Sequence, residues 1–505
     1  MKRIGIIDLG SNTARLLVAN IYDNGGYRVI DQIKESVRLS EEMTDDNILR
    51  PKRVRQTIQT LQMFKRLCEC NGVEQIVAVA TAAVRRARNQ RSFIDEVKHA
   101  TGIELQVLSG EEESYYVYLG AINSLDFNEG VIMDLGGGSF EIIYVEKRRL
   151  MHSVTIPYGA VTLTEKFALQ DKVTPEQLAN IENFVREQLD EQAPWLKKAL
   201  EKNLPIIGIG GSMRNLGKIS RKKEHYPLDM NHNYPIKVET ARSIYEHVKG
   251  LDLDRRMRIP GLSNERADIF TGALATIVTV AEYINAPEIV VGTAGLREGI
   301  LYAYAMPNVK TKPLEDMLET SLLNELSYFN MNIPHAKQVY KLALSMFDQL
   351  RSLHKLPASY RRILKTAAYM HDVGSAIRYY DHHRHAYYLI MHTNIYGLTH
   401  REQVMAAFIA AAHRKQDRPR DWARFKGVLE EGDPEIIAKL GVLVRIAESF
   451  DRTMSGAVED VACDVLGDSV IMKTQAKADV SLEIKDALTS SFYFKRAYGK
   501  NLVIL

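Results

Sequence analysis

The sequence contains two copies of a motif in which an aspartate is followed by a glycine-rich turn. Asp8 precedes Leu-Gly-Ser-Asn, and Asp134 precedes Leu-Gly-Gly-Gly-Ser. Each aspartate ends an apolar run, and a second strand-like run follows at 14–21 in one copy and 140–145 in the other, which predicts two β-hairpins. Glycine lets backbone N–H groups approach an anion, and aspartate can hold Mg²⁺ directly or through water. Two such hairpins predict two similar lobes that face one phosphate.

Further carboxylates lie close to these turns in the sequence. Glu141 begins the strand after the second turn, where it is either another group of the site or a solvated strand residue. Glu111, Glu112 and Glu113 follow Gly110 at a predicted helix start. Carboxylates in a first helical turn offset the macrodipole and cap backbone donors. One of them, held beside a phosphate, is also a candidate general base for the attack of water.

Basic residues gather in four short clusters, at 85–91, 221–223, 255–258 and 414–420. Most such runs are solvated faces, but four of them in a balanced chain suggest a long polyanionic ligand, since guanidinium groups bind phosphate in bidentate fashion. Aromatic residues are not interleaved with them, so we do not expect a nucleic-acid partner.

Histidines concentrate in the second half of the chain. Nine of the 14 lie between His335 and His413, and His371 adjoins Asp372 at the end of a predicted helix. An adjacent His-Asp pair with flanking histidines is the ligand set of metal-dependent HD phosphohydrolases. Two alternatives stay open: a second metal site formed by His335, His371, Asp372 and His413, or histidines that are simply packed.

Composition sets broader limits. The net charge of +3 is too small for a surface that coats nucleic acid. Cys68, Cys70 and Cys463 fit neither a disulfide framework nor a zinc finger, which is typical of a reducing compartment. Asp8 and Asn12 interrupt the first apolar run before a signal-peptide core could form, and no run approaches a membrane span. We therefore expect a cytoplasmic protein without membrane contact.

The elements that must position these residues follow a repeating order. Over residues 1–125 we predict a hairpin, a helix at 51–71, a buried strand at 76–80 and a strand at 103–108. The same order recurs over 126–305, which favours a duplicated α/β lobe.

The rest of the chain has a different pattern. Residues 306–453 have helical periodicity. Residues 454–505 return to short alternating runs, including 470–472 and 492–494, and predict a small tail that contains strands.

Together these motifs resemble those of the exopolyphosphatase and guanosine pentaphosphate phosphohydrolase (Ppx/GppA) family. The matching segments begin, in order, at residues 8, 80, 109, 134, 208, 261 and 295. The resemblance implies an α/β fold with two duplicated actin-like (ribonuclease-H-like) lobes at 1–125 and 126–305. It also implies an all-α HD-like domain at 306–453 and a small α+β domain at 454–505.

The resemblance also assigns roles to individual residues. It makes Glu113 the base that activates water, with Glu112 the less favoured candidate. Mg²⁺ would be positioned by Asp8, Asp134 and Glu141. Phosphate would be bound by Ser11, Asn12, Arg85, Gly136, Gly137, Ser139 and Arg266. In the HD-like part, Glu448 stands where HD proteins usually place a ligating aspartate.

The leading expectation is therefore Mg²⁺-dependent, processive hydrolysis of terminal phosphate from inorganic polyphosphate by a homodimer. Hydrolysis of guanosine pentaphosphate (pppGpp) at the same site is the alternative. An ATP-dependent kinase or chaperone-like ATPase is a second class, against which the glutamate run and the many arginines argue. A non-catalytic sensor of guanosine polyphosphates is a third, against which the complete set of acidic residues argues.

Overall fold

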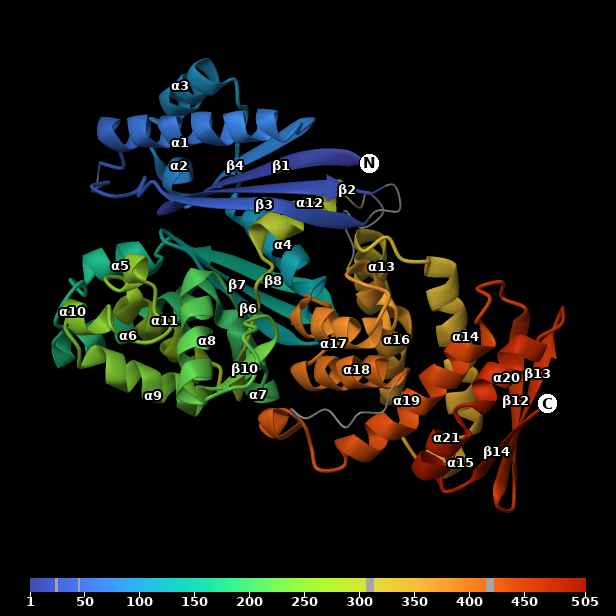
Figure 1. Ribbon diagram of the computed structural model, residues 1–505. Helices are drawn as coiled ribbons and strands as arrows, with labels where there is room; N and C mark the ends of the chain where they lie inside the picture. The colour runs from blue at the N-terminus through green and yellow to red at the C-terminus, as the bar shows by residue number, and fades with distance from the viewer. Residues whose placement is uncertain (23–25, 44–45, 306–312, 415–421) are drawn as a thin grey trace. The chain divides into compact units, whose positions relative to one another are not determined.

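The computed structural model describes residues 1–22, 26–43, 46–305, 313–414 and 422–505. Contacts divide the chain into two compact units, Met1–Glu315 and Asp316–Leu505, whose secondary structure is drawn in Figure 1. Within the described ranges, every helix is too short or too polar to cross a lipid bilayer.

The first half of unit one is built on a five-stranded sheet with the order β3-β2-β1-β4-β5 (Figure 1). The first three strands are antiparallel neighbours, whereas β4 runs parallel to β1 and β5 parallel to β4. The predicted first hairpin, the following helix and the buried strand are confirmed. The elements are β1 (Lys2–Leu9), β2 (Thr13–Ile21), β3 (Tyr27–Ser36), α1 (Pro51–Cys70), β4 (Gln75–Ala80), α2 (Ala82–Arg86), α3 (Gln90–Thr101), β5 (Leu105–Val107) and α4 (Gly110–Ile122).

The second half of unit one repeats this plan in a six-stranded sheet. Its order is β10-β11-β9-β6-β7-β8, so that without the edge strand β10 it matches the first sheet strand for strand. The predicted duplication is thus confirmed in the sheet topology. The elements are β6 (Gly130–Leu135), β7 (Phe140–Glu146), β8 (Arg149–Ile156), α5 (Ala160–Lys166), α6 (Pro175–Gln192), α7 (Lys197–Lys202), β9 (Ile206–Ile209), α8 (Gly211–Lys223), β10 (Tyr234–Lys237), α9 (Val238–Lys249), α10 (Leu253–Arg256), α11 (Phe270–Tyr283), β11 (Glu288–Val291) and α12 (Leu296–Ala305).

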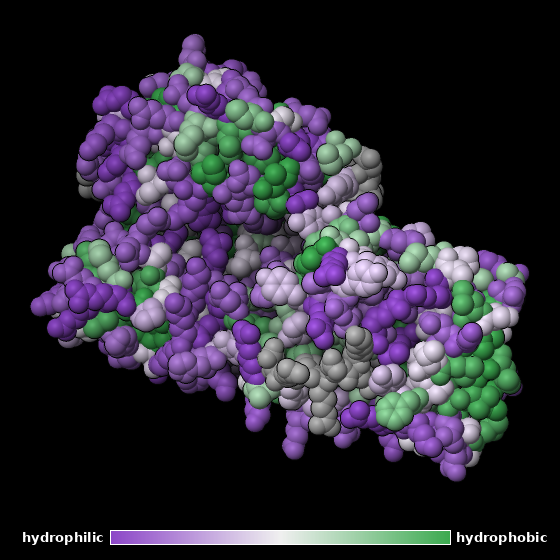
Figure 2. Space-filling view, in the orientation of Figure 1, coloured by the Kyte–Doolittle hydropathy of each residue, from purple (hydrophilic) through white to green (hydrophobic). Residues whose placement is uncertain are grey.

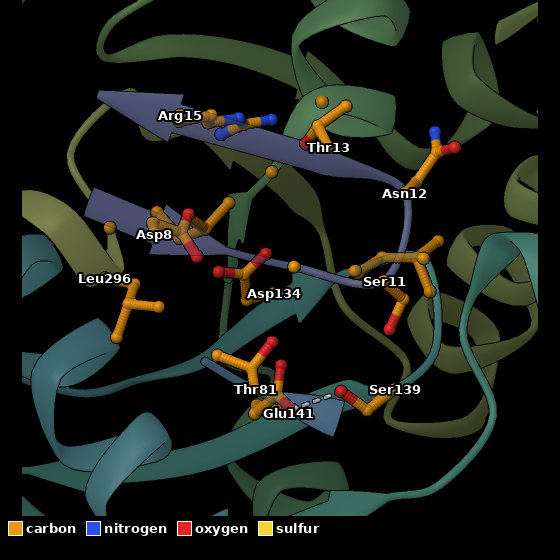
Figure 3. A pocket seen from close by; sticks show the side chains of 18 of the residues that line it. Asp8, Ser11, Asn12, Thr13, Arg15, Thr81, Asp134, Ser139, Glu141 and Leu296 are labelled. Carbon is orange, nitrogen blue, oxygen red and sulfur yellow. Dashed lines mark hydrogen bonds between the residues drawn. The ribbon is translucent and has the colours of Figure 1, made fainter. Parts of the chain in front are cut away.

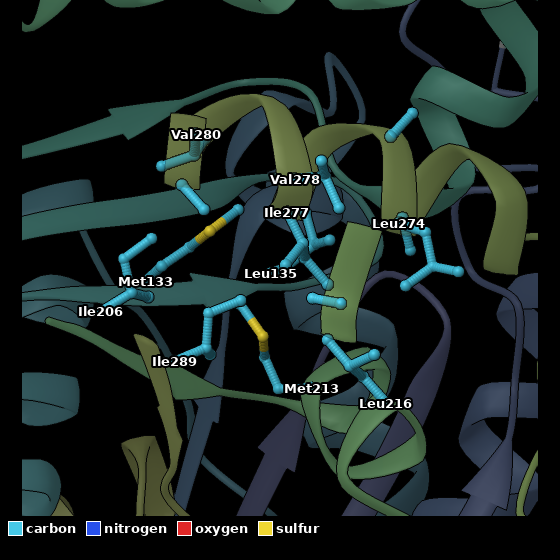
Figure 4. Packing of buried hydrophobic residues seen from close by; sticks show 14 of the residues in the cluster. Met133, Leu135, Ile206, Met213, Leu216, Leu274, Ile277, Val278, Val280 and Ile289 are labelled. Atoms are coloured by element: carbon cyan, nitrogen blue, oxygen red, sulfur yellow. The ribbon is translucent and has the colours of Figure 1, made fainter. Parts of the chain in front are cut away.

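Helix α11 is the centre of the core that supports the second hairpin. It is buried continuously from Phe270 to Ala281, as expected of a helix that is apolar on all sides. Figure 4 shows Ile277 of this helix beside Leu135 of β6, with Met213 of α8 nearby. This packing holds the end of β6, and therefore Asp134, in place.

Helices α4 and α12 cross at very close range. A Cβ atom on Gly120 would overlap the carbonyl group of Gly295, and one on Gly299 would overlap the carbonyl oxygen of Tyr116. Only glycine lets the two backbones approach so closely. Glu113 lies in the first turn of α4, so this crossing also sets the position of its carboxylate.

The crossing gives a first prediction. Gly299→Ala should lower the free energy of unfolding by about 1 to 3 kcal/mol, because the new methyl group meets backbone atoms that cannot move independently. Alanine's better helix propensity, about 1 kcal/mol, only partly offsets this cost. Urea unfolding would measure the change. Gly250→Ala is the matched control, since its nearest contact is at an ordinary 3.7 Å; equal midpoints for both variants would contradict the prediction.

Unit two is mainly helical and ends in a three-stranded sheet with the order β12-β13-β14. Figure 2 shows hydrophilic residues over most of the face in view, while hydrophobic ones gather over this small sheet. The elements are α13 (Met317–Tyr328), α14 (Ile333–Gln349), α15 (Arg351–His354), α16 (Arg361–Met370), α17 (His382–His392), α18 (His400–Ala412), α19 (Asp433–Phe450), β12 (Val458–Leu466), β13 (Ser469–Ala476), α20 (Ser481–Leu488), α21 (Ser491–Tyr498) and β14 (Asn501–Ile504).

One strand expected in the tail is wrong. Residues 470–472 lie in β13 as predicted, but residues 492–494 belong to helix α21. Phe494 is fully buried and stacks on Tyr498 one helical turn later, with ring centres 4.7 Å apart, whereas Phe492 is 70% exposed. The stacked aromatic residues are therefore four positions apart, which is a helical spacing, and a run of three residues is too short to reveal it.

Candidate active site

The two hairpin turns have the same backbone closure. The N–H of Gly10 donates to the carbonyl of Thr13, and the N–H of Gly136 donates to the carbonyl of Ser139, each at 3.0 Å. The turns also approach each other, because a Cβ on Gly138 would overlap the hydroxyl of Ser11. The duplicated turns thus meet at one place between the lobes.

A solvent-open cavity of about 870 Å³, mouth included, lies at this meeting point. In Figure 3 the side chains of Asp8 and Asp134 point toward each other across it. Residues that the sequence predicted and that line the cavity are Asp8, Ser11, Asn12, Glu113, Asp134, Gly136, Gly137, Ser139, Glu141 and Arg266.

Glu113 is the buried carboxylate in the first turn of α4, with an exposed fraction of 7%. Its Oε2 accepts a hydrogen bond from Nη1 of Arg85 at 2.7 Å. Burial raises the pKa of Glu113 to about 7, although the Arg85 guanidinium acts in the opposite direction. The group therefore has the higher basicity and the fixed position that a general base requires.

Glu112 has a different task. Its Oε2 accepts from the N–H of Ser109 at 2.8 Å, and its own N–H donates to the Ser109 hydroxyl at 3.1 Å. This reciprocal pair is a capping box that begins α4. Glu111 and Glu112 are exposed, whereas Glu113 is buried and lines the cavity.

Arg85 lies behind Glu113 instead of in the cavity wall. Its Nη1 donates both to Glu113 and to the carbonyl of Leu108, the latter at 2.9 Å. Within the described ranges it is not part of the cavity lining. The geometry therefore favours a role in orienting the Glu113 carboxylate.

The proposed metal ligands are three buried or partly buried carboxylates. Burial raises the pKa of all three carboxyl groups, and it raises that of Asp134 to about 6. The carboxylate of Glu141 also accepts a hydrogen bond from the Ser139 hydroxyl at 2.9 Å. Within the described ranges, they form no trio whose ligand atoms all lie within 4.8 Å of one another. The oxygen donors nevertheless fit Mg²⁺, which is usually held by one or two carboxylates together with water and substrate phosphates.

Four arginines face the cavity, of which sequence reasoning identified only Arg266. Arg15, Arg214 and Arg297 also line it. Burial lowers the pKa of Arg214 to about 9 and that of Arg266 to about 10, and the charge of Arg15 adds to both shifts. This crowding of cations suits a polyanionic ligand, because bound phosphates would offset their mutual repulsion.

The register of the first hairpin could have identified Arg15, one of the cavity arginines that sequence reasoning missed. Arg15 is the direct cross-strand partner of Asp8, just as Glu141 is that of Asp134. Directly opposed residues of an antiparallel pair point to the same face. Once Asp8 was assigned to the site, Arg15 could have been assigned with it.

One arginine in each of two basic clusters is structural, contrary to the expectation that it binds phosphate. Arg221 donates to Asp229, Asn231 and the Leu228 carbonyl. Arg256 is fully buried and binds Thr271 together with backbone carbonyl groups. Both guanidinium groups are engaged in hydrogen bonds that hold neighbouring loops. Of the cluster at 414–420, residues 415–420 lie outside the described residues.

The histidines predicted for a second metal site do come together in unit two. His335, His371 and Asp372 form one trio of potential ligands, and Asp372 forms another with His413 and His382, a residue that the prediction did not include. Glu448, in contrast, is paired with Arg414 at 2.8 Å and with Arg452 at 3.2 Å.

Comparison with known proteins agrees with this geometry. The sequence profile of the Ppx/GppA phosphatase family matches residues 17–306, and that of Ppx/GppA phosphatase domain III matches residues 319–489. An exopolyphosphatase from Cytophaga hutchinsonii is similar in structure, with 23% identity, a TM-score of 0.56, and coverage of 60% of this chain and 98% of its own. A family member from Aquifex aeolicus has 27% identity, a TM-score of 0.52, and coverage of 61% and 99%. The chain belongs to the Ppx/GppA phosphatase family and is a phosphoanhydride hydrolase.

Proposed function

We propose that the protein is a Mg²⁺-dependent exopolyphosphatase, which removes orthophosphate from the end of inorganic polyphosphate. The observation that carries this proposal is the position of Glu113 at a cavity lined by two phosphate-type turns and four arginines. A linear polyanion needs many fixed positive charges, and the water that attacks its end needs one fixed base.

The residues of the cavity divide the reaction among them. Backbone N–H groups of the two turns bind oxygens of the terminal phosphoryl group. The arginines offset the charge that accumulates as water oxygen attacks phosphorus and the bridging P–O bond breaks. Glu113 takes the proton from the attacking water, and Arg85 keeps its carboxylate aimed at that water. A magnesium ion held by Asp8 and Asp134 would further neutralise the transferred group.

A second cavity favours the alternative substrate, guanosine pentaphosphate. It shares Asn12 with the first, and its lining includes four acidic residues and one arginine, Arg38. Glu41 and Glu265 already pair with Arg53 and Lys34. The remaining acidic residues are Glu165 and Asp268. Carboxylates repel a phosphate chain but accept hydrogen bonds from the N–H groups of guanine.

Parallel initial rates separate the two substrates. Phosphate release from long-chain polyphosphate, guanosine pentaphosphate and ATP would be measured with Mg²⁺, for the wild type and for Asp268→Asn with Glu165→Gln. We expect polyphosphate to give the highest kcat/KM and the double variant to retain it. If guanosine pentaphosphate is preferred, and the double variant selectively raises its KM, the exopolyphosphatase proposal is wrong and the second cavity is the nucleoside site.

A further inference from the structure

Four histidines in unit two surround a single carboxylate. The Nε2 atoms of His335 and His371 lie 3.9 and 3.6 Å from Oδ2 of Asp372. Those of His382 and His413 lie 3.2 and 3.8 Å from its Oδ1. The cluster unites α14, the end of α16, the start of α17 and the end of α18. It is separate from the Glu113 cavity, which belongs to unit one.

Each of these histidines is held through its other ring nitrogen. A ring whose Nδ1–H donates to an acceptor has its Nε2 lone pair free for a metal ion, which is the usual outer-shell arrangement of metal sites. The Nδ1 partners are Oδ2 of Asp451 for His335 at 2.7 Å, and the carbonyl oxygens of Ala368 for His371 at 2.8 Å, Tyr379 for His382 at 2.8 Å and Ala410 for His413 at 2.5 Å.

Two of the inward nitrogens lack partners in the described part of the chain. His335 and His371 are 5% and 1% exposed, and their Nε2 atoms have no hydrogen-bond partner among the described residues. A buried polar atom without a partner is costly. The Nε2 atoms of His382 and His413 lie only 2.9 Å apart, so a proton or a cation must stand between them.

We propose that unit two binds a pair of divalent transition-metal ions bridged by Asp372. One ion takes His335, His371 and Oδ2, and the other takes His382, His413 and Oδ1. Each set of three offers ligand atoms that lie within 4.8 Å of one another. Glu448 is not counted as a ligand, because its carboxylate pairs with Arg414 and Arg452.

The ligand types distinguish this centre from the cavity of unit one. Imidazole nitrogen suits zinc, iron and nickel, whereas the all-oxygen set of Asp8 and Asp134 suits magnesium. A transition-metal probe in excess Mg²⁺ therefore reports on the histidine centre.

Metal content of the full-length protein tests the proposal. The protein would be stripped with chelator, dialysed against micromolar Zn²⁺ with millimolar Mg²⁺, and analysed by mass spectrometry. We expect two zinc ions per chain in the wild type, one in His371→Ala or His382→Ala, and none in Asp372→Ala. His392→Ala is the control on the same helix as His382, because His392 is exposed, and it should keep both ions.

Two further measurements, Co²⁺ absorption and thermal stability, test the proposal even if Asp372→Ala folds poorly. Co²⁺ should give visible absorption bands of nitrogen-bound ions in the wild type, and Zn²⁺ should raise its Tm. Asp451→Asn, which touches only His335 of the proposed ligands, should weaken one ion by roughly 10- to 100-fold and leave the other unchanged. Equal zinc content in the wild type and folded Asp372→Ala would overturn the proposal, and a wild type that holds only one zinc ion, absent from all four histidine variants, would overturn the bridged pair.

Discussion

Replacing Glu113 with glutamine should lower kcat for phosphate release by about 10²- to 10⁴-fold, the usual loss on removal of a general base. Glutamine keeps the size of the side chain and can still accept the hydrogen bond from Arg85 through its amide oxygen. Polyphosphate binding should therefore stay close to wild type, since the turns and the cavity arginines are unchanged. Initial rates and equilibrium binding of a labelled chain would measure the two effects separately.

Glu112→Gln is the matched control for this prediction. Glutamine serves as well as glutamate at the third helical position of a capping box, so α4 should begin normally and turnover should remain near wild type. If Glu112→Gln were the inactive variant and Glu113→Gln kept more than a tenth of the rate, the base would be one residue earlier than proposed.

The second large effect that we expect is on the Mg²⁺ concentration required for activity. Asp8→Asn and Asp134→Asn should each raise the Mg²⁺ concentration for half-maximal activity by at least about tenfold, which is the loss seen even for outer-shell partners. An amide oxygen is a weaker ligand than a carboxylate for a hard cation. Activity titrated with Mg²⁺ at fixed polyphosphate would measure the shift.

Asp126→Asn provides the comparison, since Asp126 is an exposed carboxylate of the same unit that pairs with Arg148. Its titration curve should coincide with that of the wild type. Unchanged curves for both Asp8→Asn and Asp134→Asn would remove these residues from the metal site and leave them as partners of the cavity arginines.

The hairpins and the duplication were predictable because their signals are local. Glycine turns between apolar runs determine a hairpin within about ten residues, and a repeated order of elements determines a repeated lobe. The choice between Glu112 and Glu113 was harder, since neighbouring helical residues differ by about 100° in direction. The capping box engages Glu112 at the surface, whereas Glu113 is buried and lines the cavity.

Long-range contacts account for what the sequence did not reveal. Arg214 and Arg297 reach the cavity from α8 and α12, far along the chain from the first hairpin. Arg256 has the same local appearance as a phosphate-binding residue, yet tertiary packing buries it completely. His382 was passed over because its distance from His413 depends on how α17 packs against α18.

The duplicated hairpins differ in one charge at matching positions. Arg15 stands opposite Asp8, and Glu141 stands opposite Asp134. The backbones of the two hairpins match, but their side chains differ at the cavity, where a cation in one lobe corresponds to an anion in the other. Polyphosphate has two chemically identical ends and carries no direction of its own. If polyphosphate is the substrate, as proposed, this difference between the halves would favour one direction of the bound chain over the other.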